Sequence, residues 1–113
     1  MTSIELVLYL QNLVLDKKAN DVVTLEMKKV FPAADYFLIC SVESEPQGLA
    51  IASYIEEMLA EQNISPVGIE GTQNAKWILM DYDEVIVHIF YESTRRIYDL
   101  ESLWNDAPRV HYV

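Results

Sequence analysis

The 113-residue chain carries 18 acidic and eight basic residues, which gives a formal net charge of -10. This charge disfavours nucleic acid as the main binding partner, because phosphate binding needs clustered Lys and Arg, and it favours a basic protein instead. With 51% hydrophobic residues, 23% charged residues and three glycines, the composition is that of one folded domain, residues 1–113.

The first 18 residues, MTSIELVLYLQNLVLDKK, predict an amphipathic helix that ends near Asn20. Its apolar face consists of Leu6, Val7, Leu10, Leu13 and Val14. Glu5 within the apolar part and the lack of a basic leader favour a folded helix over a signal peptide, and no apolar run reaches membrane-spanning length. We therefore expect a cytoplasmic protein without a membrane partner; an organelle is the alternative if a transit peptide was removed.

Two strands are predicted next. Residues 21–27 (DVVTLEM) are β-branched and partly alternating, whereas residues 35–42 (DYFLICSV) form a denser apolar run that is typical of a strand buried on both faces. Cys40, the single cysteine, lies in this run. A buried, inert thiol is therefore favoured over a nucleophile.

Ser44 marks the start of a second helix, because its hydroxyl can cap the first backbone amides while Gln47 reciprocates. The helix should end at Asn63, and residues 66–69 should form a short edge strand. Its predicted apolar stripe is Leu49, Ala52, Ile55, Met58 and Leu59, with Glu56, Glu57 and Glu61 outside.

A final helix is predicted to follow Ser93 as its cap, and residues 105–113 should be extended. One side of this helix carries Ile97, Leu100, Leu103 and Trp104. With the hairpin described next, the order is helix, two strands, helix, three strands, helix. This order predicts an α/β fold with a mixed five-stranded sheet and helices on at least one face.

Residues 77–90, WILMDYDEVIVHIF, predict a β-hairpin. A two-residue loop of Tyr82 and Asp83 pairs Asp81 with Glu84, Leu79 with Ile86, and Trp77 with His88. One face is then aliphatic: Ile78, Met80, Val85, Val87 and Ile89. The other carries Trp77, Leu79, Ile86, His88 and Phe90. This second face is too apolar for free solvation, so it must lie under helices or bind a partner. A shift of the strand register by one residue would exchange the two faces.

The polar residues of the hairpin suggest two kinds of site. His88 as a general base lacks a recognisable nucleophile, so a strand histidine hydrogen-bonded to a neighbour is the favoured interpretation. Asp81, Asp83 and Glu84 could hold a cation, but successive strand residues point to opposite faces, which favours a simple turn. No His/Cys ligand spacing or phosphate-binding glycine loop occurs, and we expect no catalytic residue, metal or cofactor.

Tyr98 and Glu101 lie three residues apart beside the apolar stripe of the final helix. They are either a solvated flank or the rim of a surface for a basic protein. Spacing alone favours the solvated flank.

Motifs along nearly the whole chain point to a known family. In order, they are residues 34–41 (ADYFLICS), Ser44-x-x-Gln47, Glu70-Gly71, residues 77–81 (WILMD), residues 85–88 (VIVH), Arg96-x-Tyr98-x-Leu100-Glu101-x-Leu103-Trp104 and Asp106-Ala107-Pro108. Together they resemble the ribosomal silencing factor family, also called Iojap-like proteins. Three positions depart from its pattern: Val42 and Asp83 replace common glycines, and Pro46 replaces a common basic residue.

The resemblance implies a nucleotidyltransferase-like fold without nucleotidyltransferase chemistry. It implies a translation repressor that binds the large ribosomal subunit at its protein number fourteen and blocks joining of the small subunit, while organellar relatives act in large-subunit assembly. The implied contact residues are Trp77, Leu79, Asp81, Tyr98, Leu100 and Glu101, with Glu70, Gly71 and Trp104 nearby.

Two other functions remain open at this point. The first is a divergent nucleotidyltransferase that uses Asp81, Asp83 and Glu84, although the loop at residues 41–44 (SVES) lacks the glycine of active enzymes. The second is a self-associating module, such as a homodimer, that buries Trp77 against a second copy.

Overall fold

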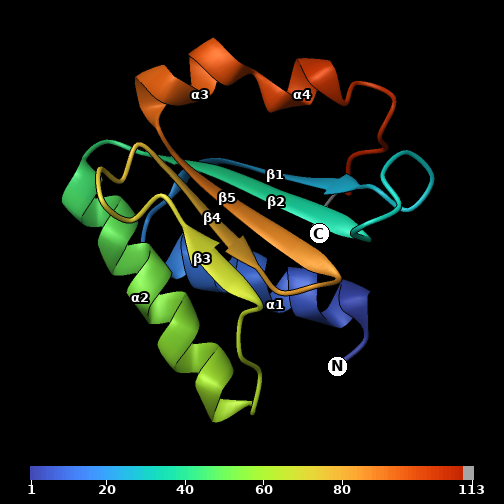
Figure 1. Cartoon of the computed structure of the whole chain (residues 1–113), viewed down its shortest axis with the longest axis horizontal. Coiled ribbons are helices and arrows are strands. Elements are labelled where there is room, and N and C mark those ends of the chain that lie inside the picture. The colour runs from blue at the N-terminus through green and yellow to red at the C-terminus, as the bar shows by residue number, and fades with distance from the viewer. Residues whose placement is uncertain (111–113) are drawn as a thin grey trace.

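A mixed five-stranded sheet forms the centre of the structure, a computed structural model that describes residues 1–110 (Figure 1). The strands lie in the order β1-β2-β5-β4-β3, and only β2 and β5 are parallel. Their bounds are β1 Asn20–Glu26, β2 Tyr36–Val42, β3 Gly68–Glu70, β4 Trp77–Asp81 and β5 Val85–Tyr91. The predicted mixed sheet is confirmed, including a fully buried β2 and a short β3 at the edge.

Helices cover both faces of the sheet (Figure 1). One face packs against α1 (Ser3–Asp16) and α2 (Glu45–Glu61), while α3 (Glu92–Tyr98) and α4 (Leu100–Leu103) lie over the other. Along the chain, α2 follows β2 on one side of the sheet, and α3 follows the parallel strand β5 on the opposite side. Among residues 1–110, no helix is both long and apolar enough to cross a membrane.

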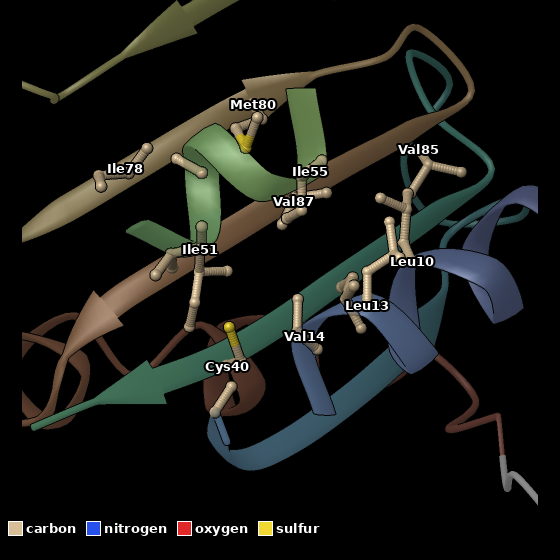
Figure 2. Close-up of a cluster of buried hydrophobic side chains, with 14 of the residues drawn as sticks. Leu10, Leu13, Val14, Cys40, Ile51, Ile55, Ile78, Met80, Val85 and Val87 are labelled. Carbon is tan, nitrogen blue, oxygen red and sulfur yellow. The ribbon is translucent and has the colours of Figure 1, made fainter. Parts of the chain in front are cut away.

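The larger core lies between the sheet and the helices α1 and α2. Figure 2 shows its side chains: Leu10, Leu13 and Val14 of α1, Ile51 and Ile55 of α2, Cys40 of β2, and Ile78, Met80, Val85 and Val87 of β4 and β5. Burial raises the pKa of the Cys40 thiol to about 12, so Cys40 is protonated at neutral pH. The predicted burial of this thiol is confirmed, and its low reactivity stays a prediction.

Side-chain caps start the two long helices. Thr2 and Glu5 form a capping box before α1, and the Ser44 hydroxyl accepts a hydrogen bond from the Gln47 backbone N–H at 3.2 Å before α2. The reciprocal bond was predicted at Ser44, but the Gln47 side chain accepts from the Glu43 backbone N–H at 3.0 Å instead.

The prediction of which residues form the apolar stripe of α2 was partly wrong. Leu49 is exposed, and Ile51 is fully buried in its place. The residues that face the sheet are Gly48, Ile51, Ala52, Ile55 and Leu59, which keep the three- and four-residue spacing of one helix face.

The hairpin register differs from the prediction by two residues. The Tyr82 backbone N–H donates to the Val85 carbonyl at 2.9 Å, so Asp83 and Glu84 form the loop and Trp77 lies opposite Phe90. Asp83 adopts a left-handed φ of 69°, and Asp81 accepts its backbone N–H at 2.8 Å. Since a shift of two keeps side-chain alternation, both predicted faces are correct.

The final helix is interrupted, which contradicts the prediction of one helix. Asp99 has φ 45° and ψ 59°, and this left-handed residue separates α3 from α4. The N-cap is Tyr91, without a side-chain capping bond, rather than Ser93. The break turns the two halves apart, so Ile97 and Leu103 are largely exposed.

The described part of the tail is extended only at its end. The Ala107 backbone N–H donates to the Trp104 carbonyl in a turn, and Arg109 then pairs with Leu25 of β1. Residues 111–113 of the predicted extended tail lie outside the described residues.

Candidate interaction surface

Trp77 joins the sheet to the helix α3. Its ring centroid lies 4.9 Å from that of Phe90 on β5 and 4.7 Å from that of Tyr98 on α3. Trp77 is half-buried, whereas Tyr98 is 55% exposed. The two rings therefore form an aromatic pair that is anchored on the inside and open to solvent on the outside.

His88 lies beneath Trp77 and is only 4% exposed. Its Nδ1 accepts the indole N–H of Trp77 at 3.1 Å, so in the neutral ring Nε2 carries the proton. The two residues are diagonal rather than directly opposite neighbours, because His88 pairs with Leu79. The prediction of a strand histidine bonded to a neighbour is confirmed. Burial lowers its pKa from 6.5 to about 4, which keeps the ring neutral at neutral pH.

The other predicted side chains on β3 and β4 follow Trp77 along the same face of the sheet toward the hairpin loop. Leu79 and Asp81 are half-buried and share its face of β4, since side chains alternate along a strand. Glu70 pairs with Leu79 from the edge strand β3 and is exposed. We call Trp77, Leu79, Asp81, Glu70 and Tyr98 the Trp77 surface.

Three residues named with this surface have internal contacts instead. The resemblance implied that Leu100 is a contact residue, but it is 8% exposed and packs in the core beneath α3 and α4, on the apolar side that the helical spacing predicted. Trp104 is half-buried and packs its ring against Phe31 and Phe37. Glu101 is mostly buried and bonds to Arg95.

Arg95 is the residue that the sequence did not reveal. Its Nη1 donates to the Asp21 carbonyl at 2.6 Å and to Ser41 Oγ at 2.7 Å, and its Nη2 donates to Glu101 Oε2 at 3.0 Å. Arg95 thereby ties α3 and α4 to strands β1 and β2. The solvated flank favoured for this pair is wrong for Glu101, which bonds to Arg95, whereas Tyr98 is 55% exposed and also packs on Trp77.

Gly71 shapes the connection that leads into Trp77. It has a φ of 86°, in the left-handed region that favours glycine. Its carbonyl accepts a hydrogen bond from Ala75 at 3.0 Å, which closes the loop between β3 and β4. Gly71 therefore sets the position at which the Trp77 strand begins.

The surface offers aromatic and aliphatic carbon beside the carboxylates of Glu70 and Asp81. Within residues 1–110, no group of three or more His, Cys, Asp or Glu residues could hold a metal ion. This arrangement is suited to binding a protein surface that combines apolar and basic groups.

Residues 1–112 match the family model described as ribosomal silencing factor during starvation. The chain belongs to this family. The ribosomal silencing factor RsfS of Halalkalibacterium halodurans is 44% identical over 110 residues, which cover 97% of this chain and 94% of that protein. A crystal structure from Bacillus halodurans, 42% identical, has a TM-score of 0.85 and covers 96% of this chain and 98% of that chain.

A more distant relative carries a different name. The mouse protein called mitochondrial assembly of ribosomal large subunit protein 1 is 29% identical over 98 residues, which cover 84% of this chain and 43% of that protein. The resemblance to the ribosomal silencing factor family that the motifs predicted is thus confirmed, and the mixed five-stranded fold matches a solved structure over nearly its full length.

Proposed function

We propose that this member of the ribosomal silencing factor family represses translation in the cytoplasm by occupying the large ribosomal subunit through its protein number fourteen. The bound protein then blocks the small subunit from joining. The family description supports a role in silencing ribosomes, and the name of the mouse relative associates that protein with the large subunit. Such exclusion needs affinity and bulk but no catalytic group.

The observation that carries the proposal is the contact between Trp77 and Tyr98, with ring centroids 4.7 Å apart at the solvent boundary. Large aromatic side chains that are partly buried before binding lose little conformational freedom in a complex, so they contribute strongly to affinity. Leu79 extends the apolar area, and Glu70 and Asp81 surround it with negative charge. Trp77, Leu79, Asp81, Glu70 and Tyr98 are the proposed contacts.

Gly71, Leu100, Glu101 and Trp104 support this surface in the proposal rather than provide most of the contact area. Gly71 fixes the start of β4, and Glu101 holds α4 through Arg95. Leu100 and Trp104 fill the core beneath the two short helices. Their substitution is expected to affect binding mainly through the shape of the surface.

The net charge of -10 fits a basic ribosomal protein as the partner. Opposite charges speed the encounter of two proteins, and salt screens the attraction. Association with the large subunit should therefore slow as ionic strength rises.

The divergent nucleotidyltransferase has less support. Its candidate carboxylates, Asp81, Asp83 and Glu84, lie at the hairpin loop. The Ser41 loop lies at the other end of the β2 and β5 pair, where Ser41 pairs with Phe90. The carboxylates and the Ser41 loop, which metal-dependent phosphoryl transfer would need together, are thus separated by the length of a strand.

Co-sedimentation with isolated large subunits tests the proposal. The double variant Trp77→Ala and Tyr98→Ala should lose binding, while Leu49→Ala, at an exposed site on the opposite helix layer, should bind like the wild type. Circular dichroism must first show that each variant is folded. Normal sedimentation of the folded double variant would show that the proposed surface is wrong.

Binding by itself does not establish repression. A translation reaction assembled from separate subunits should slow when the wild-type protein is added before subunit joining. Preformed ribosomes should be affected less. Sedimentation of the protein alone over a concentration series will reveal a homodimer, and loss of that dimer in the double variant would favour self-association as the role of Trp77.

A further inference from the structure

We infer that His88 is the positioning residue of the Trp77 surface: it takes up the indole N–H and fixes the ring so that a partner meets its carbon edge rather than its nitrogen. The inference rests on the proposed function, because it describes how the same surface is prepared for binding.

The bond is held in a fixed frame. His88 Nδ1 lies 3.1 Å from Trp77 Nε1, and the imidazole is buried between aromatic neighbours. Its ring centroid lies 4.7 Å from that of Phe37 in an edge-to-face contact and 6.2 Å from that of Phe90 in a stacked one. Since these rings restrict the imidazole, the acceptor for the indole has one position.

The histidine is a poor choice for packing alone. With Nδ1 occupied as an acceptor, Nε2 carries a proton, and within residues 1–110 it is buried without a hydrogen-bond partner. A buried N–H without an acceptor destabilises the fold, and a leucine of similar size would avoid that cost. In this structure, the bond to Trp77 offsets the cost of the buried Nε2–H.

Without an acceptor at this position, the indole N–H of Trp77 would face an apolar part of the sheet. Because Trp77 is only half-buried, its ring can turn to bring the N–H to water. That rotation would move the Trp77 ring away from Tyr98, and the contact between the two rings would be lost. His88 therefore determines the side-chain orientation that the partner encounters.

The same bond limits the chemistry of the partner. An indole nitrogen already bonded to His88 is not free to donate to a ribosomal carbonyl. The contact over Trp77 must therefore be apolar on the partner, with lysine or arginine side chains reaching Glu70 and Asp81 at the rim.

Two substitutions separate positioning from packing. His88→Asn keeps an acceptor oxygen near the place of Nδ1, whereas His88→Leu keeps the volume and removes the acceptor. His88→Leu should weaken binding to isolated large subunits about tenfold, and His88→Asn should stay within about threefold of the wild type. Equal affinity of the wild type and a folded His88→Leu variant would overturn the inference.

Nuclear magnetic resonance supplies a readout that packing alone would not change. The indole N–H signal of Trp77, assigned with Trp104→Phe, should move toward the position of a water-exposed indole in His88→Leu and stay in His88→Asn. If His88→Leu does not fold, the imidazole nitrogen signals of His88 in the wild type decide. They must show the neutral tautomer that carries its proton on Nε2. A proton on Nδ1 would refute the inference.

The two proposals fail in different ways. If Trp77→Ala with Tyr98→Ala binds normally, the proposed surface is wrong and the role of His88 in it falls as well. If that double variant loses binding while His88→Leu binds normally, only the positioning role is wrong.

Discussion

A methyl group on Gly71 would lie 1.9 Å from the carbonyl oxygen of Trp77. No ordinary contact is so short, and the φ of 86° at Gly71 disfavours any other residue as well. The glycine that the family resemblance placed near the partner thus has a structural role: it allows the β3–β4 loop to pass beside the start of β4.

Gly71→Ala should therefore lower the free energy of unfolding by more than about 2 kcal/mol, since it adds both a steric clash and backbone strain. Gly68→Ala is the matched control, because a methyl group there meets no atom within 4 Å. Its expected change is within about 0.5 kcal/mol. Urea unfolding measures the stability of both variants. Similar stabilities would contradict the close contact between the Gly71 backbone and the Trp77 carbonyl.

Arg95→Met should destabilise the protein by about 3 kcal/mol, because it leaves the Glu101 carboxylate, Ser41 and the Asp21 carbonyl without their donor. Arg96→Met removes the same charge from an exposed neighbour and should change stability by less than about 0.5 kcal/mol. Chemical unfolding of both variants tests this. Equal losses would mean that charge, and not the internal contacts of Arg95, is responsible.

Acid should destabilise the fold partly through His88. Above pH 6.5 the imidazole is neutral in both the folded and the unfolded chain, so it adds no pH dependence. Below that pH the unfolded chain binds a proton that the folded chain excludes until about pH 4, because burial holds the folded pKa there. Stability should fall by about 3 kcal/mol across this window from His88 alone.

The comparison that isolates this effect is His88→Asn, which lacks a titrating ring but keeps the carboxylates of the wild type. The stability difference between the two proteins should change by about 3 kcal/mol between pH 7 and pH 4, with the wild type losing more. A constant difference across that range would show that His88 does not resist protonation.

Asp83→Gly should raise the free energy of unfolding by up to about 1 kcal/mol, because glycine adopts the φ of 69° without strain. Asp81 accepts the backbone N–H of residue 83, so that bond survives the change. Glu84→Gly, at the other loop position, should give no gain. Thermal unfolding would disprove the argument if both variants were destabilised equally.

The Cys40 thiol should react with a disulfide reagent only after unfolding. It is fully buried, and its pKa of about 12 leaves almost no thiolate at neutral pH. The rate of labelling in native buffer should follow the rate of opening, whereas in concentrated urea it should be immediate. Rapid labelling of the folded protein would contradict the position of Cys40 in the core.

Local patterns predicted much of this fold for identifiable reasons. The unbroken apolar run of β2 can satisfy its side chains only between two covered faces, and Ser44 caps α2 from within its own segment. The hairpin faces were correct although the register was not, since an error of two residues preserves alternation.

Features that depend on distant partners were not predicted. Arg95 bonds to groups 74 and 54 residues away, and no local spacing distinguishes it from the exposed Arg96. The break at Asp99 accompanies this attachment and leaves Ile97 and Leu103 exposed, which a continuous helical repeat cannot reveal, although the repeat did place Leu100 on the apolar side. The bond of His88 to a neighbour and its closeness to Trp77 were predicted, whereas their diagonal arrangement required the true register.

Because Arg95 bonds to Asp21 and Ser41, the two early strands acquire these contacts only after Arg95 has been synthesised. The parallel partner of β2 is β5, and Tyr98 and Glu101 come later still in the chain. During synthesis, a chain that has released only its first three strands lacks both the sheet centre and the helix that positions Tyr98. The Trp77 surface therefore cannot form until translation has passed Tyr98 and Glu101, so a chain that stops before these residues cannot occupy the proposed site.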